Sequence, residues 1–341
     1  MKKARSRRVP LVVWIVISVV VILFGVGSLM GTYVLAAYNV PTGAMEKTIR
    51  VGGRVLVKKL NYLPISRGDI VVFHFPEGDT VIDLPEYQSL RPYYEVIRDL
   101  GHGNADAGRQ IVLADPNSYP LSIRPVSKRE TYLKRCIAIP GDSLVVRDEL
   151  LYIHGRAQAW PAGAQTYFHV VTGDRPLDDV IMKTKYGLDI SNSDEIRQLD
   201  SPGTYDMLLT WKAGEKMLAD GVARQIVPDI DSSTYGIFPN DEGRHWTRDN
   251  YGPIWIPKKG ASIALTQQNY PLYERIIRTY EGNELEMRGD QIYVNGRPEN
   301  SYTFKMNYYW MIGDNLHGSQ DSRYWGFVPE DHLIGKVSVI E

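Results

Sequence analysis

The chain has 341 residues, and 39 Lys and Arg nearly balance 40 Asp and Glu, so its formal net charge is −1 at pH 7. This length leaves room for about two domains. The balanced charge, with no basic patch among aromatic residues, argues against nucleic acid as a partner. Cys136 is the only cysteine, which excludes an intrachain disulfide, and its apolar context predicts a buried side chain. The histidines show no metal-ligand spacing and no phosphate-binding glycine loop occurs, so we expect neither metal nor cofactor.

An uncharged apolar run lies near the N-terminus. Lys and Arg are frequent in residues 1–8, and no charged residue follows until Glu46. Leu11–Met30 is long enough as a helix to cross a bilayer, with its positive flank in the cytoplasm. We therefore predict a cytoplasmic tail at 1–9, a single transmembrane helix at 10–37 and an extracytoplasmic remainder. A cleaved signal peptide is the alternative, which the length of the run disfavours.

The first half of the remainder is predicted to be mainly β. Residues 76–128 are mixed in character and read as an excursion from a β core at 38–154, with one short helix around Tyr93–Leu100. The apolar stretches bounded by turn residues predict the strands: Val55–Lys58, Ile70–Phe75, Leu133–Ile139, Ser143–Val146 and Leu150–Ile153.

The second half is predicted to leave this core and return to it. Residues 155–271 read as an inserted second domain, with a helical patch near Ser193–Leu199 and a distinctive run at Asp249–Pro257. The residues from Arg275 to Gly296 echo those from Arg135 to Gly155, which suggests a second hairpin; chance similarity is the alternative. The core then ends in residues 272–341, with strands at Tyr308–Ile312 and Ile334–Ile340. No long helix-period run follows the apolar segment, which again favours β structure.

Four groups of residues occur in a fixed order along the chain. The first, Pro41-Thr42-Gly43-Ala44-Met45, leads into Arg54-Val55-Leu56-Val57-Lys58. The second is Arg67-Gly68-Asp69, followed by Ile70–Phe73. The third is Tyr132–Asp142, and the fourth runs from Gly313-Asp314-Asn315 through Ser319 to Pro329.

Together these groups resemble the motifs of bacterial signal peptidase I, a family of membrane-bound serine proteases with a Ser–Lys dyad. The resemblance implies a signal-peptidase-like β core and removal of signal peptides from exported preproteins after a small-x-small motif. It also implies a bacterial plasma membrane location, with the catalytic domain on the periplasmic side. Signal peptides and the lipid bilayer would be the partners, and the oligomeric state stays open.

The resemblance also assigns roles to individual residues. Lys134 falls on the general base, Ser319 on the serine that orients it, and Thr42 on a hydroxyl of the oxyanion hole. A strand-end lysine and a turn threonine bonded to its own backbone are the alternatives. The remaining positions form two groups, one for an added substrate strand and one for structural support: Tyr38, Val40, Pro41, Tyr132 and Asp142, then Asp314, Asp321 and Arg323. Met45 is expected beside the site, either inserting into lipid or buried.

Ala44 departs from the pattern, because the family has its nucleophilic serine there. A methyl group cannot attack a carbonyl, so we expect the chain to be inactive by this mechanism. Ala44 is either an engineered replacement or the mark of a natural paralogue that binds preproteins or membrane partners; Gly53 and Leu316 also depart from the usual residues. A structural envelope protein is a third reading, and a Ser-His-Asp arrangement through His317 or His332 stays open without a supporting motif.

Overall fold

The computed structural model describes residues 18–19, 35–59, 64–77, 80–82, 93–102, 105–173, 176–241 and 243–341. The predicted cytoplasmic tail, and all of the predicted transmembrane helix except residues 18–19 and 35–37, lie outside these ranges. Within them, no helix is long and apolar enough to cross a membrane.

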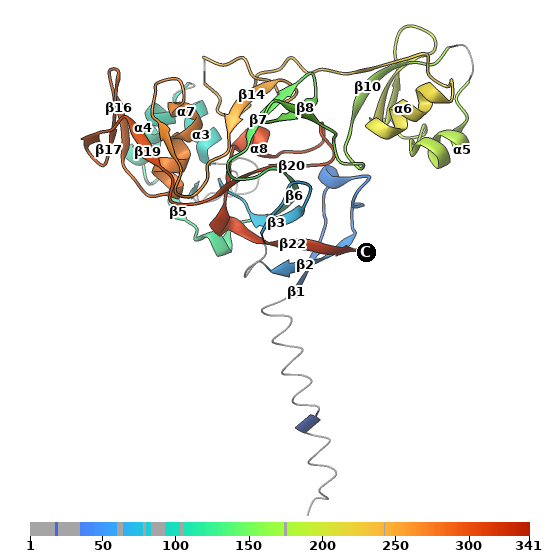
Figure 1. The fold of residues 1–341 in the computed structure, drawn as a ribbon. Helices are drawn as coiled ribbons and strands as arrows, with labels where there is room; N and C mark the ends of the chain where they lie inside the picture. The colour runs from blue at the N-terminus through green and yellow to red at the C-terminus, as the bar shows by residue number, and fades with distance from the viewer. Residues whose placement is uncertain are drawn as a thin grey trace, which may run out of the picture.

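A curled antiparallel sheet forms the centre of the molecule (Figure 1). Its strands, in spatial order, are β1 (Leu35–Asn39), β2 (Arg54–Lys59), β22 (Leu333–Ile340), β3 (Ile70–His74), β6 (Thr131–Ala138), β20 (Tyr308–Ile312) and β21 (Val328–Pro329). β3 is apolar on both faces and lies inside the sheet, whereas β2 alternates, with Val55 and Val57 fully buried. The sheet therefore joins residues from both ends of the chain, as the mainly β prediction required.

A second sheet continues from this one through the turn after β6. It contains β14 (Tyr251–Trp255), β7 (Ser143–Arg147), β8 (Leu150–Ile153) and β9 (Arg156–Gln158). Asp148 and Glu149 form the tight turn between β7 and β8, with φ angles of 47° and 60°. This left-handed turn matches the twist of a two-stranded hairpin.

The lobe beside β14 holds helices and short hairpins (Figure 1). Its elements are β4 (Thr80–Ile82), α3 (Tyr93–Leu100), α4 (Ala105–Ala114), β5 (Leu121–Ile123), η2 (Val126–Lys128), β15 (Ser262–Ala264), α7 (Tyr270–Arg275), η4 (Ile276–Tyr280), β16 (Leu285–Arg288), β17 (Gln291–Val294), β18 (Arg297–Pro298) and β19 (Ser301–Thr303). The helix predicted at Tyr93–Leu100 is confirmed, because Val96 and Ile97 fall on its buried face. The prediction of a second hairpin from the repeated residue pattern is partly confirmed. β16 and β17 form this hairpin, but the residues around Arg275 are helical rather than a strand.

The inserted stretch folds around a hydrophobic core of its own, and Figure 1 shows it projecting on the opposite side from β16 and β17. Its elements are β10 (Gln165–Val171), α5 (Asp179–Ile181), η3 (Met182–Tyr186), β11 (Ile196–Gln198), β12 (Thr204–Thr210), α6 (Trp211–Ala219) and β13 (Gln225–Pro228). The helical patch predicted near Ser193–Leu199 is wrong, because this segment is strand β11 paired to β12. Tyr251 and Ile254 do not belong to this core; they pack with Leu144 in the main hydrophobic cluster. The core of the insert therefore covers a shorter part of the chain than 155–271.

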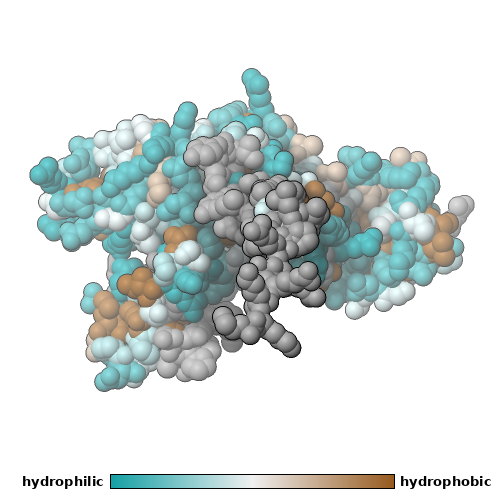
Figure 2. Space-filling view, turned by 90° about the horizontal axis from the view of Figure 1, so that it is seen from below, coloured by the Kyte–Doolittle hydropathy of each residue, from teal (hydrophilic) through white to brown (hydrophobic). Residues whose placement is uncertain are grey.

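One face of the described domain is largely hydrophilic where no grey atoms cover it. Figure 2 shows it mostly teal and white, with apolar side chains in a few separate patches. The side chains at Ile123 and Val51 are among the exposed apolar ones in the described chain.

The separate core of the insert makes a direct prediction. Leu209→Ala removes a fully buried side chain from that cluster, which costs about 2–5 kcal/mol in the free energy of unfolding. Limited proteolysis read by mass spectrometry should then show faster cleavage within 165–228 while the main sheet stays protected. The matched control is Leu144→Ala in the main cluster, which should expose the main sheet; equal loosening of both regions by Leu209→Ala would contradict independent cores.

Candidate active site

The bend at Ala44 follows directly on the edge strand β1. Residues Gly43–Met45 form a single 3₁₀ turn, η1, that contacts β6. Thr42 before it is extended and exposed, and its hydroxyl makes no capping hydrogen bond, so the alternative of a threonine capping this turn is not seen. Met45 is buried, and its sulfur accepts the Asp314 N–H at 3.4 Å, which places it in the interior rather than in lipid.

Lys134 lies on β6, opposite Val71 of β3, and only 4% of the residue is exposed. Burial lowers the pKa of Lys134 to about 8; Asp321 and Asp314 oppose this shift and Arg323 adds to it. Its Nζ lies 6.0 Å from the centroid of the Tyr132 ring and forms no hydrogen bond with the described part of the chain. An amine in this state has a substantial neutral fraction near pH 8 and a free lone pair.

Ser319 is buried close to the Ala44 bend, and Gly313 lies between them. A Cβ atom built on Gly313 would stand 2.2 Å from Ser319 Oγ and 2.6 Å from the Ala44 carbonyl oxygen. Only glycine fits there. The Ser319 hydroxyl makes one long contact, 3.5 Å to the Gln320 carbonyl, so it keeps the capacity to bind another group.

Two carboxylate–guanidinium pairs support the loop that carries Ser319. Arg323 donates from Nε to Asp321 Oδ1 at 2.8 Å and from Nη2 to Oδ2 at 2.9 Å, and Asp321 also accepts the Gly313 N–H at 3.1 Å. Both side chains are buried, and the neighbouring Arg323 guanidinium outweighs burial to hold the pKa of Asp321 below its usual range.

The second pair was not foreseen. Arg135 binds Asp314 in a fork, from Nε at 2.7 Å and Nη2 at 2.5 Å, and Thr48 donates its hydroxyl to the same carboxylate. The available signal was the position of Arg135, next to Lys134 in the third motif. Asn315 was missed as well: its backbone N–H and side-chain amide donate to the carbonyls of Ala44 and Gly43 at 3.0 and 3.2 Å.

Two strands of the central sheet, β1 and β6, offer the candidate edges for a substrate. β1, which holds Tyr38, is an edge strand that pairs only with β2. β20 pairs with β6 only from Arg135 to Ala138, so Thr131–Lys134 have β3 as their partner among the described strands. Tyr132 is half-buried and stacks on Phe75 with ring centroids 4.8 Å apart.

The other residues assigned to the substrate differ in their surroundings. Pro41 is exposed, whereas Val40 is buried in the small cluster under β2. Asp142 is also buried, and its carboxylate is already bound by Arg67 at 2.7 and 2.5 Å and by the Ile139 N–H at 2.9 Å. The Asp142 carboxylate therefore holds the turn after β6 and is not open to a substrate.

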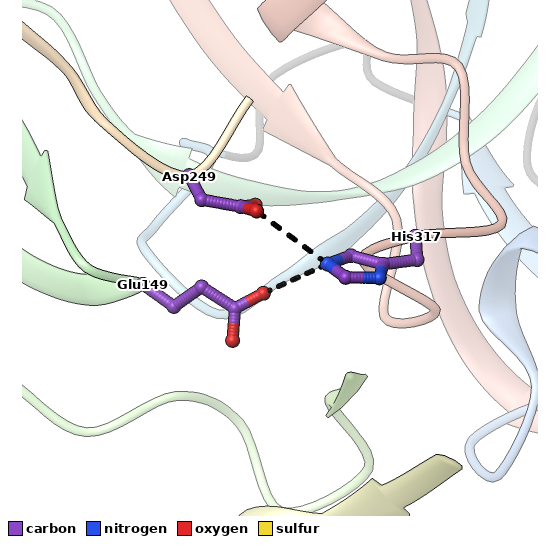
Figure 3. Close-up of side chains that lie close together, drawn as sticks. All are labelled: Glu149, Asp249 and His317. Atoms are coloured by element: carbon purple, nitrogen blue, oxygen red, sulfur yellow. Dashed lines mark hydrogen bonds and ion pairs between the residues drawn. The ribbon is translucent and has the colours of Figure 1, made fainter. Parts of the chain in front are cut away.

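One buried histidine meets two carboxylates near the site. Figure 3 shows His317 Nε2 facing Glu149 and Asp249; it lies 3.1 Å from Glu149 Oε1 and 3.6 Å from Asp249 Oδ2. These three groups offer ligand atoms within 4.8 Å of one another, a set that suits a divalent cation or a proton on the histidine. His332 is bound to Asp331 at 2.7 Å, so within the described residues neither histidine is bonded to Ser319.

Burial of Lys134 should cost stability. Because its folded pKa of about 8 lies below 10.5, the unfolded chain binds more protons between these values and the native state gains stability as pH rises through them. Lys134→Met should therefore raise the free energy of unfolding at pH 7 by about 1–3 kcal/mol, with a smaller gain at pH 10. Chemical denaturation at both pH values measures this. Lys58→Met, on an exposed lysine of the same sheet, is the control; a loss of stability in Lys134→Met at pH 7 would contradict the desolvation argument.

The chain matches a known family of proteins. The model of the family described as "Signal peptidase, peptidase S26" matches residues 11–178 and 297–340, more than half of the chain, and leaves out 179–296. A signal peptidase I from Leptolyngbya laminosa is 33% identical over 105 residues, which cover 24% of this chain and 52% of that protein. One from Bacillus caldolyticus is 25% identical over 190 residues, covering 54% and 71%.

A third relative, a signal peptidase I from Buchnera aphidicola subsp. Schizaphis graminum, is 51% identical over 45 residues, 13% of this chain and 14% of that protein. The chain thus spans about a seventh of the length of the Buchnera relative and about half of the length of the Leptolyngbya relative. On the family match, together with a mainly β core in which both ends of the chain share one sheet, the chain belongs to the signal peptidase, peptidase S26 family.

Proposed function

We propose that the site is that of a membrane-bound serine endopeptidase that removes signal peptides from exported preproteins, and that the chain as it stands binds such substrates without cleaving them. The observation that carries this proposal is the buried Lys134 amine, which has a lowered pKa and no hydrogen-bond partner among the described residues, on a strand that contacts the Ala44 bend. Such an amine serves as a general base near neutral pH.

With serine at position 44, the reaction would proceed by acyl transfer. The serine Oγ attacks the scissile carbonyl while Lys134 Nζ takes its proton, and a C–O bond forms. The Thr42 hydroxyl and the N–H of residue 44 donate to the oxyanion. Lys134 then gives the proton to the leaving amine as the C–N bond breaks, and water hydrolyses the ester with Lys134 as base. Ser319, whose hydroxyl contacts only the Gln320 carbonyl among the described residues, would have to turn to the amine in order to orient it.

With Ala44 the first step has no nucleophile, but the binding groups remain. The backbone edge of β1 and the unpaired edge of Thr131–Lys134 would add the substrate as a strand, main chain to main chain. The resemblance to the family implies small residues at the first and third positions before the cleaved bond. The apolar N-terminal run would anchor the chain in the bacterial plasma membrane, with this domain on the periplasmic side.

A natural binding paralogue is the second candidate, and one observation favours it. Leu316, where the family usually has arginine, is 2% exposed and packs into the main hydrophobic cluster. Its N–H and carbonyl are both bonded, to the Gln165 carbonyl at 2.9 Å and by Arg323 Nη2 at 2.6 Å. A departure so well fitted to its surroundings speaks for divergence of the fourth motif as a whole rather than for a single replacement at Ala44.

Restoring the nucleophile tests the enzyme directly. We expect Ala44→Ser to cleave a preprotein in lipid or detergent after a small-x-small motif, with a rate that rises as pH passes through about 8, because the neutral Lys134 amine is the active form. Gel mobility and N-terminal sequencing of the product measure this. Lys134→Ala in the same background should remove cleavage; an intact preprotein with Ala44→Ser at every pH would favour the binding paralogue.

Binding by the unaltered chain is a separate prediction. A fluorescent signal peptide with alanine at both small positions should bind and stay uncut, and phenylalanine at the third position before the bond should weaken binding by at least about tenfold. Fluorescence anisotropy in bicelles measures the difference. Equal affinity for both peptides would show that the site does not select small residues.

A further inference from the structure

The loop between β20 and α8 (Ser322–Trp325) carries the groups that act on Lys134. Asp314, Ser319 and Asp321 all lie on it, within residues 313–321. Asn315 ties its start to the Ala44 bend through two hydrogen bonds, and Arg323 ties its end through Asp321. His317 lies between these two ties, two residues before Ser319.

His317 is fixed by residues from two distant segments. Its side chain is 5% exposed, and the side chains of Glu149 and Asp249 are 2% and 1% exposed. Figure 3 shows the three residues reaching toward one another from three separate stretches of chain. Glu149 comes from the β7–β8 turn, and Asp249 from the run before β14 that is distinctive in the sequence.

The two carboxylates are themselves held firmly, so the loop is the part that they constrain. Thr166 donates its hydroxyl to Glu149 Oε1 at 2.5 Å, and Asp249 Oδ2 accepts the Asp231 N–H at 2.8 Å. The Glu149 N–H also donates to the Asp249 carbonyl at 3.1 Å. The β7–β8 turn and the segment that carries Asp249 are thus joined by a hydrogen bond.

The backbone of Glu149 adopts an unfavourable conformation in the turn that carries this side chain. Its φ of 60° lies in the left-handed region, where a residue with a Cβ costs of order 1 kcal/mol relative to glycine. A hairpin turn of this kind ordinarily takes glycine at this position. A glutamate there, buried against His317, indicates that its contact with the loop offsets the backbone cost.

The charges favour a firm contact. Burial works to lower the pKa of His317, but hydrogen bonds to Asp249 and Glu149 outweigh it and the net direction is upward, with Arg248 opposing. Arg248 Nε lies 3.8 Å from Asp249 Oδ2 and 3.1 Å from Asp231 Oδ2. A protonated His317 between two buried carboxylates relieves their mutual repulsion.

We propose that His317, held by Glu149 and Asp249, is a positioning residue: it fixes the loop that places Ser319 and Gly313 against the Ala44 bend and keeps water away from the Lys134 amine. This rests on the proposed function of the site. It gives a role to Asp249, which lies in the stretch that the family model leaves out. Small movements of the loop would matter, because the space around Gly313 admits no Cβ atom.

The test reads the amine itself, in the full chain with Ala44. Lysine labelled with ¹³C at the ε carbon is titrated by NMR, and the Lys134 signal is assigned by its loss in Lys134→Met. We expect a pKa of about 8 in the unaltered chain. His317→Ala and the nearly isosteric Asp249→Asn should each move it upward by about one pH unit, because a loosened loop lets water reach the amine.

The two variants separate positioning from direct charge effects. Through space alone, removing a positive His317 would raise the pKa of Lys134, and removing a negative Asp249 would lower it. An upward shift in both supports positioning, whereas opposite shifts, or none, overturn it. The matched control is His169→Ala, since His169 also stands between two carboxylates, Asp206 at 2.5 Å and Asp229 at 3.3 Å, but lies in the insert on β10. It should leave the Lys134 signal unmoved.

Activity in the Ala44→Ser background provides the second reading. There, Asp249→Asn should lower kcat with little change in KM and move the acid limb of the pH–rate profile upward, in step with the NMR pKa. A loss of thermal stability with an unmoved acid limb would assign a merely structural role. If Ala44→Ser cleaves nothing, the proposed function fails, and the NMR titration still decides the positioning role of His317.

Discussion

Keeping the Lys134 amine out of water is the constraint on which the rest of the site depends. Burial lowers its pKa to about 8 although two carboxylates nearby oppose the shift. That requires Lys134 to lie on β6 beside β3, and the Ser319 loop to lie close against the Ala44 bend. Burying an amine that forms no hydrogen bond with the described residues lowers the stability of the fold, and such costs are common at functional sites.

Buried charges around this amine are arranged in sets that hold one loop. Arg135 holds Asp314 at the start of the loop, His317 is held by Glu149 and Asp249 in the middle, and Arg323 holds Asp321 at the end. Buried ion pairs contribute little net stability, because desolvation offsets the attraction. Their effect here is geometric: each set removes one way for the loop to move away from Lys134.

Much of the fold could be predicted from the pattern of apolar residues, and the failures have a physical cause. β8 and β20 match their predicted ranges, and β2, β3, β6 and β7 agree within one or two residues. The prediction of a strand at Ile276-Ile277 is wrong, because a short apolar run suits a strand and a buried helix equally well. Only the packing of the folded chain decides between them. The opposite error occurs around Ile196. This polar stretch is predicted to be helical, but it forms strand β11 because it pairs with the edge of β12.

The amino-acid sequence alone gives the positions of the motifs and the alanine at position 44, because the identity of a side chain does not depend on folding. Only the tertiary structure decided which polar groups meet. Asp142 is an example, since its carboxylate proved to be bound by Arg67 within the protein. His317, Glu149 and Asp249 are another: they come from three segments that lie far apart in the sequence, and a contact between such distant residues exists only once packing has closed the loops between them.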